Sequence, residues 1–193
     1  MKKIVFAVIL SLFVTGINAQ PEFDLGLKAG LNNSKISNNL EDFTSESIIA
    51  WHLGVYTRLG LNRFYLQPEA YFSSKGGDLK EVLSHSIASF NYNTFDMPVL
   101  AGYKILDKES FNLRVMAGPV FSFITSGEVS REDLFDADFY RNNFFGWQYG
   151  LGADLYFVTF DARIENSSNR IYSSPNLKSR NNTFFVTVGI RIL

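Results

Sequence analysis

Residues 183–193 alternate strictly between two kinds of side chain. One set is wholly apolar, and the other includes Thr187, Gly189 and Arg191. Alternation with a period of two predicts a β-strand with one apolar face. A strand at the end of a fold needs a neighbour, because its backbone N–H and C=O groups otherwise stay unpaired. We therefore expect this strand to pair with the first strand of the fold, which closes a barrel.

The same alternation recurs along the chain and predicts eight strands. The eight alternating stretches are residues 23–32, 49–60, 64–73, 94–105, 111–124, 145–156, 158–165 and 183–193. Their connections are also of two kinds, short ones at 61–63, at 106–110 and near Phe157, and long ones at 33–48, 74–93, 125–144 and 166–182. An even number of strands with tight turns at one end and long loops at the other is typical of an outer-membrane β-barrel.

The two faces of the predicted strands differ in charge. The apolar set contains no charged residue in any of the eight strands. The alternate set contains six basic residues (Lys28, Arg58, Lys104, Arg114, Arg163, Arg191) and six acidic residues (Asp24, Glu69, Asp96, Asp154, Asp161, Glu165). Equal numbers of opposite charges suit a buried lumen, where each ion needs a partner to offset its desolvation.

Side-chain volume indicates which face is inward. The interior of an eight-stranded barrel is only just wide enough for side chains, and the bulky apolar set would overfill it. The alternate set holds all ten strand glycines, Gly26, Gly30, Gly54, Gly60, Gly102, Gly118, Gly146, Gly150, Gly152 and Gly189. We therefore expect the apolar set to face lipid in an all-β, antiparallel, up-and-down transmembrane barrel. The alternative is a soluble secreted barrel whose apolar set lines a ligand cavity.

Aromatic residues gather near both ends of the predicted strands, as the two membrane interfaces would select. We expect five in particular to lie at these interfaces: Trp51, Phe72, Tyr103, Phe121 and Trp147. Three prolines, Pro68, Pro98 and Pro119, fall inside predicted strands. Since proline cannot donate to a ladder, each predicts a bulge or an interruption of the pairing.

The first 19 residues are typical of a signal peptide. Lys2 and Lys3 form a basic start, residues 4–14 are apolar, and Ala19 ends a suitable cleavage site. Cleavage leaves residues 20–193 as one barrel domain and changes the formal charge from −1 to −3, because two lysines are lost. This balance offers no basic surface for nucleic acid, and the absence of cysteine excludes disulfides and a lipid-attachment thiol.

Several segments resemble one family of membrane proteins. Residues 94–103 (Thr-Phe-Asp-Met-Pro-Val-Leu-Ala-Gly-Tyr) resemble the fourth strand of the PorT-like outer membrane protein beta-barrel domain family. Later strands of that family resemble residues 116–119 (Met-Ala-Gly-Pro), 150–155 (Gly-Leu-Gly-Ala-Asp-Leu) and 160–163 (Phe-Asp-Ala-Arg). The resemblance implies a small eight-stranded barrel of the OmpA/OmpX type. It implies little about activity, although the namesake is linked to a protein-secretion and gliding apparatus.

The charged lumen supports two hypotheses. Either its ions form a salt-bridged plug or they line a narrow, selective channel for small solutes. Because packed side chains leave no aqueous pore in eight strands, we favour the plug. We expect the network to comprise Lys28, Arg58, Glu69, Asp96, Lys104, Arg114, Asp154, Asp161, Arg163 and Arg191.

Enzymatic and metal-binding motifs are weak in this sequence. A less favoured alternative is an enzyme at the outer rim that acts on lipid or peptide, because His85 lies between Ser84 and Ser86 in a long connection. No carboxylate position is specified, however, so we expect no catalytic residue. Residues 130–140 contain Asp133, Asp136 and Asp138, which could gather around a calcium ion, but their spacing matches no calcium loop and we favour a solvated, helical segment. We therefore expect no cofactor and no metal.

The expected role lies in the long connections, as adhesion, surface protection or a partner surface for an envelope assembly. We expect a monomer whose partners are outer-membrane lipids, the barrel-assembly machinery during insertion, and an extracellular ligand or envelope protein.

Overall fold

The computed structural model describes residues 22–37, 43–81, 87–129, 143–167, 172–173 and 178–193. The predicted signal peptide, residues 1–19, lies outside them and stays a prediction. The strands are β1 (Glu22–Ser37), β2 (Phe43–Leu61), β3 (Phe64–Glu81), β4 (Ile87–Lys108), β5 (Phe111–Val129), β6 (Asn143–Leu155), β7 (Val158–Ser167), β8 (Tyr172–Ser173) and β9 (Lys178–Arg191). Within the described residues, no helix has the length and apolar character needed to cross a membrane.

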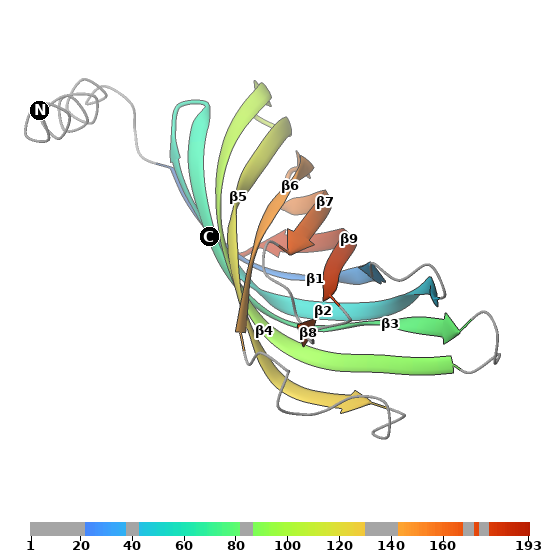
Figure 1. The fold of residues 1–193 in the computed structure, drawn as a ribbon. Coiled ribbons are helices and arrows are strands. Elements are labelled where there is room, and N and C mark those ends of the chain that lie inside the picture. The colour runs from blue at the N-terminus through green and yellow to red at the C-terminus, as the bar shows by residue number, and fades with distance from the viewer. Residues whose placement is uncertain (1–21, 38–42, 82–86, 130–142, 168–171, 174–177) are drawn as a thin grey trace, which may run out of the picture.

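Eight of these strands form a closed antiparallel barrel (Figure 1). Each strand from β1 to β6 pairs with the next strand in the chain, β7 pairs with β9, and β9 pairs with β1. The closing ladder runs from the Gly26–Arg191 pair to the Ser37–Arg180 pair. The predicted fold class is therefore confirmed, as is the pairing of the last strand with the first. The two-residue β8 pairs only with the beginning of β9.

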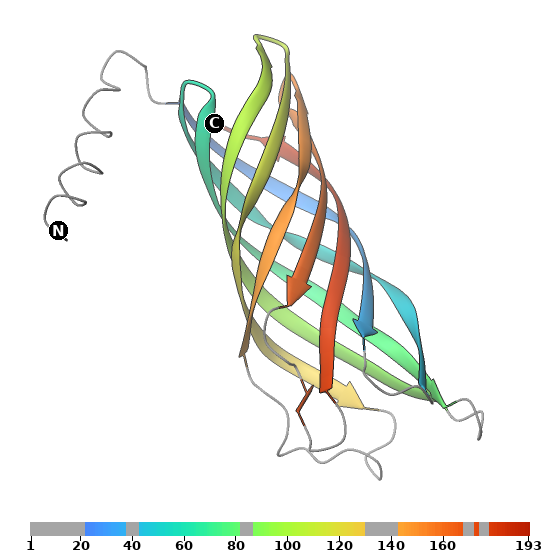
Figure 2. The ribbon, with the colours of Figure 1, turned by 45° about the horizontal axis from the view of Figure 1, so that its top comes forward.

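The strands are staggered around the barrel. Paired residues can be followed once around the wall from Glu22 through Gly60, Tyr65, Gly102, Met116, Gly150, Arg163 and Phe185. The circuit returns to β1 at Asn32, ten residues beyond its start. Closure with such a stagger requires the strands to tilt relative to the barrel axis, and Figure 2 shows this tilt.

The predicted strand boundaries next to the long connections are wrong. β3 continues to Glu81 and β4 begins at Ile87, so most of the predicted 74–93 loop is strand. β2 and β5 are likewise extended, to Phe43 and Val129. In these extensions the apolar outer face ends, because its next positions are Ser47, Ser74, Asn93 and Thr125. The apolar alternation on which the prediction depended therefore stops although the hairpins continue.

The three short turns lie at the opposite end of the barrel and are tight. Asn62 and Arg63 join β2 to β3, Glu109 and Ser110 join β4 to β5, and Tyr156 with Phe157 joins β6 to β7. Tyr156 adopts a φ of 55°. This left-handed conformation is rare for residues with bulky side chains. The turn near Phe157 was accordingly hard to predict, since it contains no glycine, asparagine or proline.

The strand prolines interrupt pairing without shifting the register. The β4–β5 ladder lapses between the Pro98–Val120 and Ala101–Ala117 pairs, next to Pro119. The β2–β3 ladder lapses in the same way opposite Pro68. The predicted interruptions are therefore present, and register shifts occur elsewhere in these two ladders.

Candidate functional site: the lumenal charge network

In the structure, the alternate set of strand residues faces the lumen and the apolar set faces the outside of the barrel. All twelve charged residues of the alternate set point into the barrel, and each is buried except Arg191, which is partly exposed. Two further charged residues join them, Lys75, which is buried, and Glu22, which is partly exposed. The network thus contains seven basic and seven acidic residues from β1, β2, β3, β4, β5, β6, β7 and β9.

Arginine–aspartate pairs fill the half of the lumen nearest the short turns. Arg58 Nη1 lies 2.9 Å from Asp154 Oδ2 and 3.3 Å from Asp24 Oδ2. Arg114 Nη2 lies 2.9 Å from Asp154 Oδ1 and 2.7 Å from Asp161 Oδ1. Planar guanidinium groups suit this arrangement because their donors can engage several carboxylate oxygens at once.

Ion pairs also cross the rim of the same half. Arg191 contacts Asp24 at 3.4 Å and donates to the Tyr156 carbonyl oxygen at 2.8 Å. Lys104 pairs with Glu22 and lies 3.7 Å from Asp107. These contacts join β1 and β4 across the mouth of the barrel, and β9 to the turn between β6 and β7.

A polar pocket of about 260 Å³ lies at this end of the barrel. Its lining includes Glu22, Arg191 and Asp154. Asp154 is held by Arg58 and Arg114, so at this point the pocket meets the salt-bridged interior. The pocket is therefore bounded on its inner side by the charge network.

The charge network has a middle layer, between the arginine–aspartate pairs and the layer nearest the long connections, and Glu69 is its centre. Its carboxylate pairs with Lys28 and, at 2.8 Å, with Arg163. Gln67 connects this layer with the arginine–aspartate half, because it accepts from Arg58 Nε at 2.9 Å and donates to Glu69 at 2.7 Å.

The layer nearest the long connections is built around a single lysine. Lys75 Nζ lies 2.9 Å from Asp96 and 2.6 Å from Glu165. Gln148 links this layer to the middle one, because it donates to Glu165 at 2.7 Å and accepts from Arg163 at 3.2 Å. A continuous chain of polar contacts therefore runs along the lumen from Arg191 to Asp96.

Aromatic rings surround this lysine. Lys75 Nζ lies 5.4 Å from the Phe144 ring centroid and 5.6 Å from that of Phe185. His52 packs edge-on against Phe185, with ring centroids 5.2 Å apart, and its Nε2 lies 2.9 Å from Thr187 Oγ1. Among the described residues, no carboxylate oxygen forms a hydrogen bond with His52.

Glycine is required where strands crowd the lumen. A Cβ atom on Gly118 would lie 2.0 Å from the Val99 carbonyl oxygen, and one on Gly54 would lie 2.2 Å from that of Ala70. Because both clashes involve backbone atoms, a side chain could be accommodated only by moving a strand. These close approaches agree with the glycine-rich inner face expected from the sequence.

The ten predicted network residues all lie inside the barrel, and the structure brings them together with residues that sequence reasoning missed. Lys75 was missed because residue 75 fell in a predicted loop, and Glu22 because it precedes the first predicted strand. Gln67 and Gln148 carry no charge, so counting charges did not reveal them. Their inward position in the alternation was the available signal.

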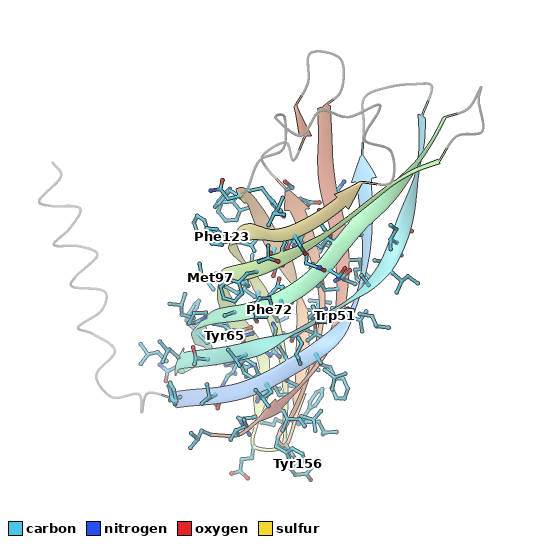
Figure 3. The ribbon with its side chains drawn as sticks, turned by 90° about the horizontal axis from the view of Figure 1, so that it is seen from below. Trp51, Tyr65, Phe72, Met97, Phe123 and Tyr156 are labelled. Atoms are coloured by element: carbon cyan, nitrogen blue, oxygen red, sulfur yellow. The ribbon has the colours of Figure 1, made fainter. Side chains whose placement is uncertain are left out.

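The five predicted interface aromatics lie on the outside of the barrel wall. Trp51, Phe72, Phe121 and Trp147 are each about half exposed. Tyr103 is partly buried against Phe64, with ring centroids 5.0 Å apart. Figure 3 shows Trp51, Phe72 and Phe123 on the strands and Tyr156 at the short-turn end.

The height of this apolar outer face matches a membrane. On β1 the outward apolar positions run from Phe23 to Leu31, which is roughly 26 Å along the strand. A tilt of about 40° reduces this to roughly 20 Å along the barrel axis, close to the apolar band of outer-membrane barrels.

The residues of the alternative enzyme and calcium hypotheses cannot be placed. His85, Asp133, Asp136 and Asp138 lie outside the described residues. In the described part of the chain, no group of three or more His, Cys, Asp or Glu side chains is arranged to hold a metal ion.

The family model for the outer membrane protein beta-barrel domain matches residues 18–173. The chain belongs to this family. The barrel is therefore an integral outer-membrane protein, and its exposed apolar face is the surface that contacts lipid. The alternative of a soluble barrel with the apolar set inside is wrong.

The solved structure of OprG shows the same fold. The barrel is similar to the outer membrane protein OprG from Pseudomonas aeruginosa, with a TM-score of 0.58 at 10% identity over 90% of this chain and 98% of that one. It is also similar to Ail of Yersinia pestis, with a TM-score of 0.47 at 14% identity over 89% and 99% of the two chains. No curated protein matches the chain.

Proposed function

We propose that this protein is a non-conducting barrel that anchors surface-exposed connections in the outer membrane, where they bind a partner. The observation that carries the proposal is the unbroken polar chain from Arg191 to Asp96. Its side chains point into the lumen and all are buried except Arg191, which supports a closed passage. Function then resides outside the lumen, in the long connections.

The charge network is suited to closing the lumen because its members hold one another from several strands. Arg114, for example, comes from β5 and contacts Asp154 of β6 and Asp161 of β7. Moving one of these side chains aside would leave a buried carboxylate unpaired, which is strongly unfavourable. A spontaneous opening of the lumen is therefore expected to be rare.

The partner is expected to be an adhesion ligand or another envelope protein. The resemblance of residues 94–103 to a strand of the PorT-like barrels supports an envelope or secretion assembly. We expect the barrel to act as a monomer and to have no enzymatic activity.

Conductance in planar lipid bilayers tests the proposal. The purified full-length protein should give no stable current steps. A variant with Arg58→Ala, Gln67→Ala and Glu69→Ala should conduct, because these substitutions remove side chains from adjoining layers of the network. Arg63→Ala, in an exposed turn, is the matched control and should stay silent. Steady current through the unaltered protein would instead establish the narrow channel.

A further inference from the structure

A ring of uncharged polar side chains surrounds the barrel at the boundary of its apolar outer face that lies nearest the long connections. On every strand of the wall, the outward position directly beyond the last apolar residue is an asparagine, a serine or a threonine. The eight residues, which we call the amide–hydroxyl ring, are Asn33, Ser47, Ser74, Asn93, Thr125, Asn143, Asn166 and Asn182. Six of them are exposed, and Ser74 and Asn166 are partly exposed.

Each ring residue lies next to the apolar band. On the outer face of β4, Asn93 lies directly beyond Phe95 toward the long connections, and on that of β6 Asn143 lies directly beyond Phe145. The inward residues between them, such as Phe144, are buried, so the alternation continues through the ring. The ring therefore marks the level at which the outer wall passes from hydrocarbon to lipid headgroups.

Hydrogen bonds orient several side chains of the ring. Asn93 Nδ2 donates to Ser126 Oγ at 3.0 Å, and the Thr125 hydroxyl donates to the Asn93 carbonyl oxygen at 3.1 Å. Asn166 Nδ2 donates to the Tyr149 hydroxyl at 2.9 Å, which connects the ring to an aromatic residue of the apolar outer face. Two pairs of ring residues, Ser74–Asn93 and Asn166–Asn182, are direct partners in the ladders.

The other end of the apolar band is chemically different. There the turns and the adjoining end of β4 carry charged, exposed residues, namely Arg63, Asp107, Lys108 and Glu109. Short turns of outer-membrane barrels face the periplasm, so these charges meet the inner leaflet and the amide–hydroxyl ring meets the outer leaflet. The two ends of the wall are thus matched to different headgroups.

We propose that the amide–hydroxyl ring binds the sugar headgroups of glycolipids in the outer leaflet. An amide both donates and accepts hydrogen bonds, as a sugar hydroxyl does, so the two are complementary. Phosphate groups only accept hydrogen bonds and are bound preferentially by arginine and lysine. No ring position carries a charge, and Lys35 is the nearest described basic residue beyond it on β1.

The test compares lipids retained by the full-length protein. The protein is folded into phosphatidylcholine vesicles that contain equal small amounts of diglucosyl diacylglycerol and phosphatidic acid. It is then extracted in mild detergent, and bound lipids are counted by native mass spectrometry. The unaltered protein should retain the glucosyl lipid about fivefold over phosphatidic acid, which corresponds to one or two net hydrogen bonds.

Substitution of the ring should abolish this preference. The ring variant carries Asn93→Ala, Asn143→Ala and Asn166→Ala. The control carries Arg63→Ala and Ser110→Ala in the short turns and should retain the full preference. Heat-dependent gel mobility verifies that each variant is folded. If the triple variant fails to fold, Asn143→Ala alone should reduce the preference by about half.

Three results would overturn the proposal: equal retention of both lipids by the unaltered protein, preferential retention of phosphatidic acid, and an unchanged preference in the ring variant. The second result would indicate phosphate recognition by basic residues such as Lys35. None of these results bears on conductance, so the lumenal proposal is tested separately.

Discussion

The two ends of the lumen balance their charges in different ways. Near the short turns, three arginines (Arg58, Arg114, Arg191) meet three aspartates (Asp24, Asp154, Asp161). Near the long connections, Lys75 alone meets both Asp96 and Glu165. The first group is neutral by itself, whereas the second has one more carboxylate than cations.

The middle layer corrects this imbalance. Lys28 and Arg163 share the single carboxylate of Glu69, which leaves one positive charge in excess. Gln148 lies between Arg163 and Glu165 and contacts both. The lysine layer therefore depends on its neighbour for neutrality, while the arginine–aspartate group does not. Loss of a cation should consequently be most costly in the lysine layer.

The largest effect is expected for Lys75→Met. The substitution keeps an unbranched side chain, one atom shorter, but leaves Asp96 and Glu165 buried without a described cation in contact. Breaking a buried ion pair in this way costs about 3–5 kcal/mol of unfolding free energy. Urea unfolding in lipid vesicles, followed by the fluorescence of Trp51 and Trp147, measures the loss.

Two further variants separate charge from packing at this lysine. Lys35→Met removes an exposed lysine from β1 and should change the unfolding free energy by less than about 0.5 kcal/mol. Adding Asp96→Asn and Glu165→Gln to Lys75→Met should restore most of the stability. If the triple variant stays as unstable as Lys75→Met, the contacts of Lys75 with Phe144 and Phe185 are more important than its ion pairs.

A smaller loss is expected for Arg114→Met. Asp161 then loses the one cation that pairs with it among the described residues, but Asp154 keeps its contact with Arg58. We expect a loss of about 2–4 kcal/mol, between that of one buried hydrogen bond and that of a whole buried pair. The same unfolding assay applies, with Arg63→Met as the exposed control. A loss larger than that of Lys75→Met would show that the arginine–aspartate group is the less tolerant of the two.

The smallest effect is expected for Gln148→Leu. The substitution removes the link between the middle and lysine layers without changing any charge. A loss of about 1–2 kcal/mol is expected for its hydrogen bonds. Combined with Lys75→Met, it should give a non-additive result, because both substitutions act on Glu165. Simple addition of the two losses would mean that the layers are energetically independent.

The sequence by itself determined the eight strands, the closure of the barrel and the direction in which its residues face. Alternation is a local property, since neighbouring side chains of any strand point to opposite faces. The segregation of charge and glycine from bulky apolar residues then decided which face is inward. Trp51 and Arg58, seven residues apart in β2, could be assigned to opposite sides of the wall on this basis alone.

Only the tertiary structure decided which charges meet and how far the strands extend. Partners such as Lys75 and Glu165 are 90 residues apart, and they face each other because of the stagger accumulated around the closed barrel. That stagger depends on the register of every ladder, which no local pattern encodes. The extensions of β2–β5 are held by strand pairing beyond the apolar outer face, where the apolar alternation used for the prediction has ended.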